Sequence, residues 1–173
     1  TGLAPLRENA YLLSLLQNFG RTPLLGVLAG AVFTSIVQSS SATTGIVIAM
    51  TNQGVLDLPA AVAIVLGSNI GTCVTALLAS IGTALSARRA AVAHLLFNVT
   101  GVVIALIVFR PYVSLITLTG ETVARQAANA HTIFNLANTI IFLPLLKQFV
   151  SLVTFLVPGE DVAVEMGPKY LDK

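Results

Sequence analysis

Long stretches without a charged residue divide this chain, and their lengths predict its helices. The uncharged stretches are residues 22–56, 58–87, 90–109 and 126–146. A helix needs about 20 apolar residues to cross a hydrocarbon core that is about 30 Å thick. Two of the stretches have that length, and we expect full transmembrane helices at about 88–109 and 122–147.

The first stretch has the wrong length for simple crossings. A single helix over 22–56 would be about 52 Å long, yet two full crossings and a loop do not fit. The polar run Gln38-Ser39-Ser40-Ser41 divides the stretch into two apolar arms. Arms of about 23 Å favour a re-entrant helical hairpin, which enters and leaves by the same face of the membrane. Its tip is predicted at residues 38–42, near the middle of the bilayer.

A second polar interruption lies within residues 58–87. The segment Gly67-Ser68-Asn69-Ile70-Gly71-Thr72 places two glycines four residues apart with polar residues around them. Glycine and short polar side chains are unfavourable in a helix interior. We therefore expect a discontinuous transmembrane helix at about 58–81, with an unwound middle.

The remaining parts of the chain are less apolar. We expect an amphipathic helix within residues 1–20, a transmembrane unit over 21–157, and a polar tail at 158–173 that leads to a soluble segment. The sequence therefore predicts an all-α membrane protein.

Composition supports this class. Hydrophobic residues make up 55% of the chain and charged residues only 9%, against about 25% charged residues in soluble domains. The net charge of +2 is too small to indicate a nucleic-acid partner, and the single cysteine excludes an internal disulfide. Motifs for a serine hydrolase or a zinc protease are absent from the sequence, which argues against an enzyme.

A short pattern occurs twice in the second half of the chain. Residues 93–98 and 130–135 both read A-H-x-x-F-N, which places His94 with Asn98 and His131 with Asn135 on one face of each predicted helix. Polar side chains at such positions often form hydrogen bonds between membrane helices. We expect these four residues to form a supporting polar network; a direct ligand role for either histidine is the alternative.

The two polar interruptions have the chemistry of a binding site for ions. The N-termini of half-helices attract anions, whereas unwound carbonyls, hydroxyls and amide oxygens suit small hard cations such as Na⁺. Paired broken elements that meet at mid-membrane are a recurring construction of secondary transporters. Packing of small residues is the competing explanation.

These elements together resemble a known family. The run Q-S-S-S-A-T-T at 38–44 and the run G-S-N-I-G-T at 67–72, followed by His94 and Asn98, closely resemble the type II sodium-dependent phosphate cotransporter family. The resemblance implies a sodium-coupled carrier of inorganic phosphate that works by alternating access. It also implies two inverted repeats in the whole carrier, of which this chain has one, resembling the C-terminal repeat. The fold expected is thus one transporter repeat with a re-entrant hairpin, a discontinuous helix and two full transmembrane helices.

The resemblance also assigns roles to residues. Phosphate would contact Ser39, Ser40, Ser41 and Asn69. Sodium would be held by Gln38, Ser39, Ser68, Thr72 and Thr75. The expected partners are phosphate, membrane lipid, and a second repeat or a second copy of the chain in a pseudo-symmetric pair; the expected location is the inner cell membrane, with several crossings. A non-transporting membrane scaffold linked to a soluble phosphate-signalling domain, or an anion pore, is the alternative function.

Overall fold

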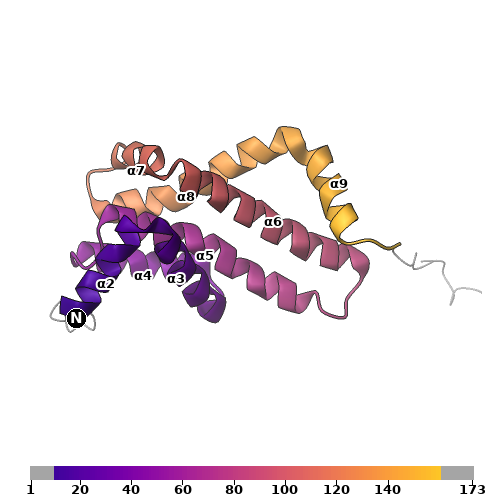
Figure 1. The fold of residues 1–173 in the computed structure, drawn as a ribbon, viewed down its shortest axis with the longest axis horizontal. Coiled ribbons are helices and arrows are strands. Elements are labelled where there is room, and N and C mark those ends of the chain that lie inside the picture. Colours follow the sequence, from indigo (N-terminus) through magenta and orange to yellow (C-terminus); the bar gives the residue numbers. More distant parts are fainter. Residues whose placement is uncertain (1–9, 161–173) are drawn as a thin grey trace, which may run out of the picture.

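The computed structural model describes residues 10–160, and these residues form helices joined by short turns (Figure 1). The α-helices are α2 (Ala10–Arg21), α3 (Pro23–Val37), α4 (Ser40–Asn52), α5 (Leu58–Ala79), α6 (Leu85–Ile107), α7 (Phe109–Thr117), α8 (Val123–Phe142) and α9 (Leu146–Leu156). A short 3-10 segment, η1 (Leu143–Leu145), joins α8 to α9. Residues 1–9 of the predicted amphipathic helix and residues 161–173 of the predicted tail lie outside the described residues.

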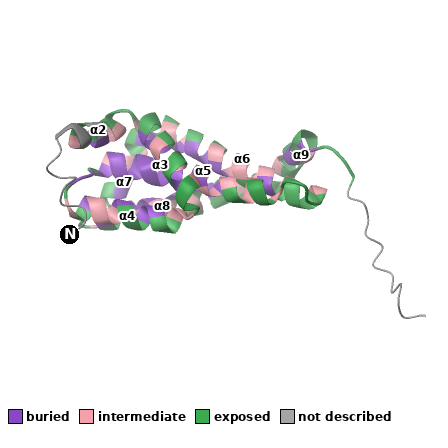
Figure 2. Cartoon of the chain, turned by 90° about the horizontal axis from the view of Figure 1, so that it is seen from below, coloured by how far each residue is buried: buried purple, intermediate pink, exposed green. Residues whose placement is uncertain are grey.

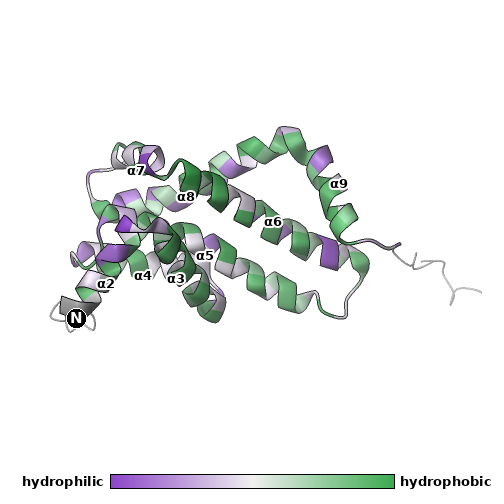
Figure 3. Ribbon diagram, in the orientation of Figure 1, coloured by the Kyte–Doolittle hydropathy of each residue, from purple (hydrophilic) through white to green (hydrophobic). Residues whose placement is uncertain are grey.

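Three helical segments of the described chain are long and apolar enough to cross a membrane. They are α5, α6 and the combined segment Val123–Leu156. Many large apolar side chains remain exposed, among them Leu28, Val32 and Ile36 on α3, and Figure 3 shows the hydrophobic character of α3 and α6. A surface this apolar is expected where lipid or another protein covers it. The chain is therefore a membrane protein.

Helix α5 is the centre of the structure. Its first half is almost entirely buried, and it contacts α2, α3, α4, α6 and α8. Figure 2 shows the buried residues gathered where α3, α4 and α7 surround it, whereas α9 at the other end is largely exposed. The helix begins with Asp57, whose carboxylate accepts a hydrogen bond from the N–H of Ala60 at 2.9 Å and so caps the first turn.

A seam of glycines brings α3 and α5 unusually close together. A Cβ atom built at Gly30 would overlap the backbone of Ile64, and one built at Gly67 would overlap the backbone of Val27. Gly71 approaches the carbonyl of Ala31 in the same way. Small residues spaced four apart let membrane helices approach to backbone contact, and here both helices have them. The two helices run in the same direction along this seam.

The predicted break in α5 is wrong, because the helix is continuous from Leu58 to Ala79. The glycines serve close packing rather than unwinding. The polar side chains between them bond to the helix's own carbonyl groups: Ser68 Oγ donates to Val65 O at 2.7 Å, and Thr72 Oγ1 donates to Ser68 O at 3.0 Å. These bonds satisfy the hydroxyls without interrupting the backbone pattern.

The polar break between α3 and α4 is present. Gln38 ends α3 in the left-handed conformation, with φ 59° and ψ 24°, and Ser39 begins α4 with its hydroxyl accepting from the N–H of Ala42 at 3.2 Å. The two arms are joined by a buried hydrogen bond of 2.8 Å between the hydroxyls of Thr34 and Thr43. The arms have 15 and 13 residues, so each is too short to cross a bilayer. The re-entrant path of this hairpin through a membrane stays a prediction.

The later helices differ from expectation mainly at their ends. Helix α6 covers the predicted 88–109 helix as far as Ile107. The predicted 122–147 helix bends at η1, where Pro144 lies. Proline has no N–H for the helical pattern. Helix α7 was not predicted; its apolar residues Phe109 and Ile116 are buried, with Tyr112 bonded to the carbonyl of Ala130 at 2.6 Å.

The end of α9 is tied back to α6. Arg89 donates from Nε to Val157 O at 3.1 Å and from Nη2 to Gly159 O at 3.0 Å. An arginine in this position satisfies carbonyl groups that a helix end leaves unpaired.

Candidate functional site

A cavity of about 240 Å³ collects polar side chains from four helices near the middle of the molecule. Three asparagines lie near the centres of their helices: Asn69 in α5, Asn98 in α6 and Asn135 in α8. If these helices cross a membrane, the cavity lies close to mid-depth. The lining residues are Ser40, Asn69, Thr72, His94, Phe97, Asn98, His131 and Asn135.

The start of α4 supplies one wall. Ser39 is the N-cap of this helix, and Ser40, its first residue, lines the cavity. The N–H groups in the first turn of a helix have no partner within the helix, apart from those that the cap satisfies. In α4 the cap takes the N–H of Ala42. The cavity wall thus combines a hydroxyl with the partly positive end of a helix.

An amide pair joins α5 to α8 across the cavity. Asn135 Nδ2 donates to Asn69 Oδ1 at 3.3 Å and to His131 O at 2.8 Å. Asn69 in turn donates from Nδ2 to Val65 O at 3.0 Å. This arrangement orients the Asn69 side chain, because both ends of its amide have partners.

The two A-H-x-x-F-N segments have the same local geometry. Asn98 donates to the carbonyl of His94 at 2.9 Å, as Asn135 does to that of His131. All four residues line the cavity. The four residues therefore lie together, but the Asn98–His94 and Asn135–His131 bonds each stay within one helix. That these residues form a supporting network stays a prediction.

Other predicted site residues lie away from this cavity. Gln38, Ser41 and Thr75 are exposed, and Ser39 is half-buried. Ser68 is fully buried and bonded within its own helix. Of the predicted sodium ligands, the structure places only Thr72 in the cavity wall. Because α3 runs alongside α5 in the same direction, its end at Gln38 comes to about the level of Thr75.

Sequence reasoning missed Phe97 and Asn138. The Asn138 side chain is buried against Gly101 and donates to Phe97 O at 3.1 Å. Its Oδ1, like Thr44 Oγ1, has no hydrogen-bond partner within residues 10–160. The available signal was helical spacing, since Asn138 follows Asn135 by three residues and therefore lies on the same side of α8.

The cavity lining contains no Asp, Glu, Lys or Arg. Within the described residues there is also no cluster of three or more His, Cys, Asp or Glu side chains that could hold a metal ion. Apart from the two histidines, the lining therefore offers hydroxyl and amide groups as donors and acceptors.

Comparison with known proteins decides the family. Residues 6–147 match the model of the Na⁺/Pi-cotransporter family. The chain belongs to this family. The predicted type II sodium-dependent phosphate cotransporter resemblance is thus confirmed.

Relatives of this cotransporter chain occur in bacteria and in mammals. It is 45% identical over 80 residues to the "Uncharacterized protein YqeW" of Bacillus subtilis (strain 168), which is 46% of this chain and 26% of that protein. It is 44% identical over 84 residues to human sodium-dependent phosphate transport protein 2C, covering 46% of this chain and 14% of the relative. Human protein 2B is 40% identical over 90 residues, covering 49% and 13%.

The matched segments thus span about a quarter or less of these relatives. The named relatives are transport proteins rather than enzymes, in agreement with the sequence prediction. No solved structure matches the chain.

Proposed function

We propose that this chain forms one repeat, over residues 21–157, of an inverted-repeat carrier that moves inorganic phosphate together with sodium. The observation that carries the proposal is the cavity in which the start of α4 at Ser40 faces Asn69 and Thr72. The family membership and the names of the human relatives supply the substrate class.

Phosphate binding is supported by the donors around Ser40. A hydroxyl, the first N–H groups of α4 and the amide of Asn69 are the groups that a phosphate oxygen accepts from. We assign Ser39 and Ser41, which flank Ser40 at the hairpin tip, to the same phosphate contact once the second half of the carrier closes over the tip.

Sodium is the counter-charge that the cavity lacks. No lysine or arginine lines it, and a helix N-terminus supplies only about half a charge against the one to two charges of phosphate. A desolvated anion with so little compensation is costly. Hydroxyl and amide oxygens suit Na⁺, and we assign it to the predicted set of Gln38, Ser39, Ser68, Thr72 and Thr75.

The exposed hairpin tip calls for a partner. Gln38 and Ser41 are exposed, and on the predicted re-entrant path they would lie within the bilayer. A second repeat, or a second copy of the chain, would cover these polar groups and close the site. The expected location is a cell membrane, the inner one in a bacterium.

Uptake of radioactive phosphate into proteoliposomes tests the proposal. The assembled carrier should accumulate phosphate when sodium is present outside and not when choline replaces it. Ser40→Ala and Asn69→Ala each remove a hydrogen bond to a charged group, which is worth about 1.5–3 kcal/mol, so the apparent phosphate affinity should fall about tenfold to a hundredfold.

Ser35→Ala is the matched control. Ser35 lies on the other arm of the hairpin and donates to Ala31 O at 2.7 Å, so its loss should leave uptake near the parent value. Equal uptake in sodium and choline, or parent-like affinity in Ser40→Ala, would contradict the proposal.

A further inference from the structure

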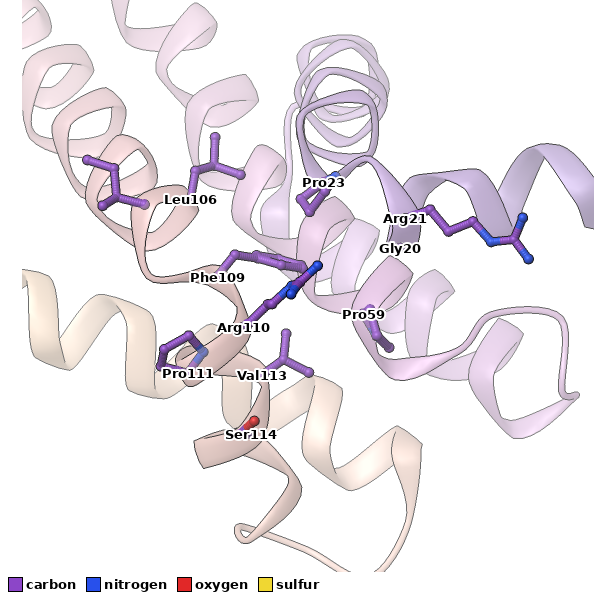
Figure 4. A pocket seen from close by; sticks show the side chains of 11 residues that line it. Gly20, Arg21, Pro23, Pro59, Leu106, Phe109, Arg110, Pro111, Val113 and Ser114 are labelled. Carbon is purple, nitrogen blue, oxygen red and sulfur yellow. The ribbon is translucent and has the colours of Figure 1, made fainter.

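A second and larger cavity lies at one end of the molecule, away from the polar site. Its volume is about 900 Å³, and it opens between the α2–α3 turn, the start of α5 and the α6–α7 corner. It is lined by Gly20, Arg21, Pro23, Pro59, Leu106, Ile107, Phe109, Arg110, Pro111, Val113 and Ser114. Figure 4 shows Arg110 extending across the middle of this cavity beside Phe109, while the guanidinium of Arg21 points outward.

The position of the cavity is that of a membrane surface. Helices α5 and α6 have 22 and 23 residues, which gives each about 33–35 Å, slightly more than the hydrocarbon core. Pro59 at the start of α5 and Ile107 at the end of α6 therefore lie where hydrocarbon meets headgroups. Helix α7 follows α6 at this level, with Phe109 and Ile116 buried in the protein core and Arg110 and Ser114 exposed.

Two arginines and no acid line the cavity, although the carboxylate of Asp57 lies beside Gly20 at its edge. Arg21 and Arg110 are exposed, and neither guanidinium has a hydrogen bond or ion pair within the described part of the chain. Asp57 and Arg21 both line a smaller neighbouring cavity. The carboxylate of Asp57 caps α5 by accepting from the N–H of Ala60. Asp57 does not line the larger cavity.

The walls around the arginines are apolar. Seven of the other lining residues are proline, leucine, isoleucine, phenylalanine or valine, and Ser114 adds one hydroxyl. Arginine presents a planar fork of donors that fits two oxygens of a phosphate group. A ligand that suits both parts of the cavity carries a phosphate group and hydrocarbon together.

We propose that this cavity binds the phosphate group of an anionic phospholipid, with Arg110 as the main contact and Arg21 at the rim. The apolar walls accept the glycerol end and the first methylene groups of the acyl chains. Free inorganic phosphate shares the anionic chemistry but leaves these walls without a partner. The proposal is independent of phosphate transport through the mid-membrane cavity.

Native mass spectrometry of the assembled protein, released from nanodiscs, tests the proposal. With phosphatidylglycerol we expect retained lipid on the parent protein, and with phosphatidylcholine at the same density we expect little. Arg110→Gln should weaken phosphatidylglycerol retention about tenfold, since it removes a charge-assisted contact. Arg21→Gln should weaken it less. Arg88→Gln is the charge-matched control, because Arg88 is exposed at the opposite end of α6, and it should retain lipid like the parent.

Three results would overturn the proposal: parent-like retention by Arg110→Gln, equal retention of the two lipids, or displacement of phosphatidylglycerol by inorganic phosphate. Arg110→Lys supplies a second variant, which keeps the charge but loses the fork. It should retain more lipid than Arg110→Gln, and weaker retention by the lysine variant would contradict the charge-based contact. Matching thermal unfolding of all variants shows that they are folded.

Discussion

Gln38 holds a backbone conformation that ordinarily favours glycine. Its φ of 59° lies in the left-handed region, and it is the one non-glycine residue with positive φ within residues 10–160. A side chain with a Cβ atom is disfavoured there by about 1–2 kcal/mol, and glycine is the usual residue at such a helix end. Glutamine at this position therefore carries a backbone cost that glycine would avoid.

Replacing Gln38 by glycine should separate backbone strain from side-chain function. We expect Gln38→Gly to stabilise the protein slightly, by up to about 1 kcal/mol, because the strain is relieved. Sodium-dependent phosphate uptake should nevertheless fall, since a proposed sodium ligand is lost. Thermal unfolding and uptake measured on the same preparation check both parts. Unchanged uptake would remove Gln38 from the proposed sodium set.

Tyr112 is a residue whose role depends on its proton. Its hydroxyl donates to Ala130 O at 2.6 Å and so fastens α7 to α8. Burial raises the pKa of Tyr112 above its ordinary value, because the charged phenolate is poorly solvated there. The neutral, donating form therefore persists in the folded protein at pH values where an exposed tyrosine ionises.

Tyr112→Phe should lower the free energy of unfolding by about 1 kcal/mol. The difference from the parent should be constant up to about pH 10, the ordinary tyrosine pKa. Above that pH the unfolded parent loses a proton that the folded parent keeps, so the parent's advantage should shrink as the pH rises. Parallel unfolding curves at pH 7–11 measure this, and a difference that grows above pH 10 would contradict the assignment.

Residue patterns predicted much of the cavity. The cavity is lined by Ser40, Asn69, Thr72 and the His and Asn of both A-H-x-x-F-N segments. Polar side chains in an apolar stretch need hydrogen-bond partners and therefore gather. The same patterns could not show that Ser68 bonds to its own helix or that Asn138 fits over Gly101. Those facts depend on which side chains face each other, and residue order alone does not determine that.

The elements show why one feature of the fold was misread. Gly67 and Gly71 suit either an unwound segment or close helix packing, so their spacing alone does not distinguish the two. The distinguishing signal lies on the partner, where Gly26 and Gly30 repeat the spacing on α3 and meet α5. The break between α3 and α4 was predicted from the polar run at 38–41, whereas the re-entrant path of the hairpin stays a prediction.

The glycine seam can be tested with matched substitutions. A methyl group at Gly67 meets the backbone of Val27, which cannot move aside without separating α3 from α5. We expect Gly67→Ala to destabilise the protein by about 1–3 kcal/mol or more. Gly45 lies in helix α4 with nothing within 4 Å of an added Cβ, so Gly45→Ala should be neutral or stabilising. Thermal unfolding in mild detergent compares the two; a harmless Gly67→Ala would show that the seam is loose.

At the scale of the whole molecule, polar groups of the hairpin tip remain uncovered. Gln38 and Ser41 are exposed, as are apolar side chains on the outer face of α3, such as Ile36 at 78%. Lipid can cover the apolar side chains, but it leaves the polar groups without hydrogen bonds, at several kcal/mol in total.

We therefore expect the purified 173-residue chain to pair with a second copy in mild detergent. The pairing should place the two hairpin tips near a common axis that lies in the membrane plane. Native mass spectrometry or mass photometry measures the state directly. A stable monomer as the sole species would contradict the expected partner.

The contact between α3 and α5 also limits which parts could move during the proposed transport cycle. Backbone touching backbone leaves no side-chain rotamers to adjust, so sliding or rolling of one helix on the other brings atoms into collision. The first arm of the hairpin and the central helix therefore behave as one stiff body. In the proposed alternating-access cycle we expect α4, α6 and α8 to move relative to that body, because their links to it include side-chain contacts such as Thr34 with Thr43 and Asn69 with Asn135. The helices expected to move in this proposed cycle are thus the ones that carry Ser40 and the two histidines.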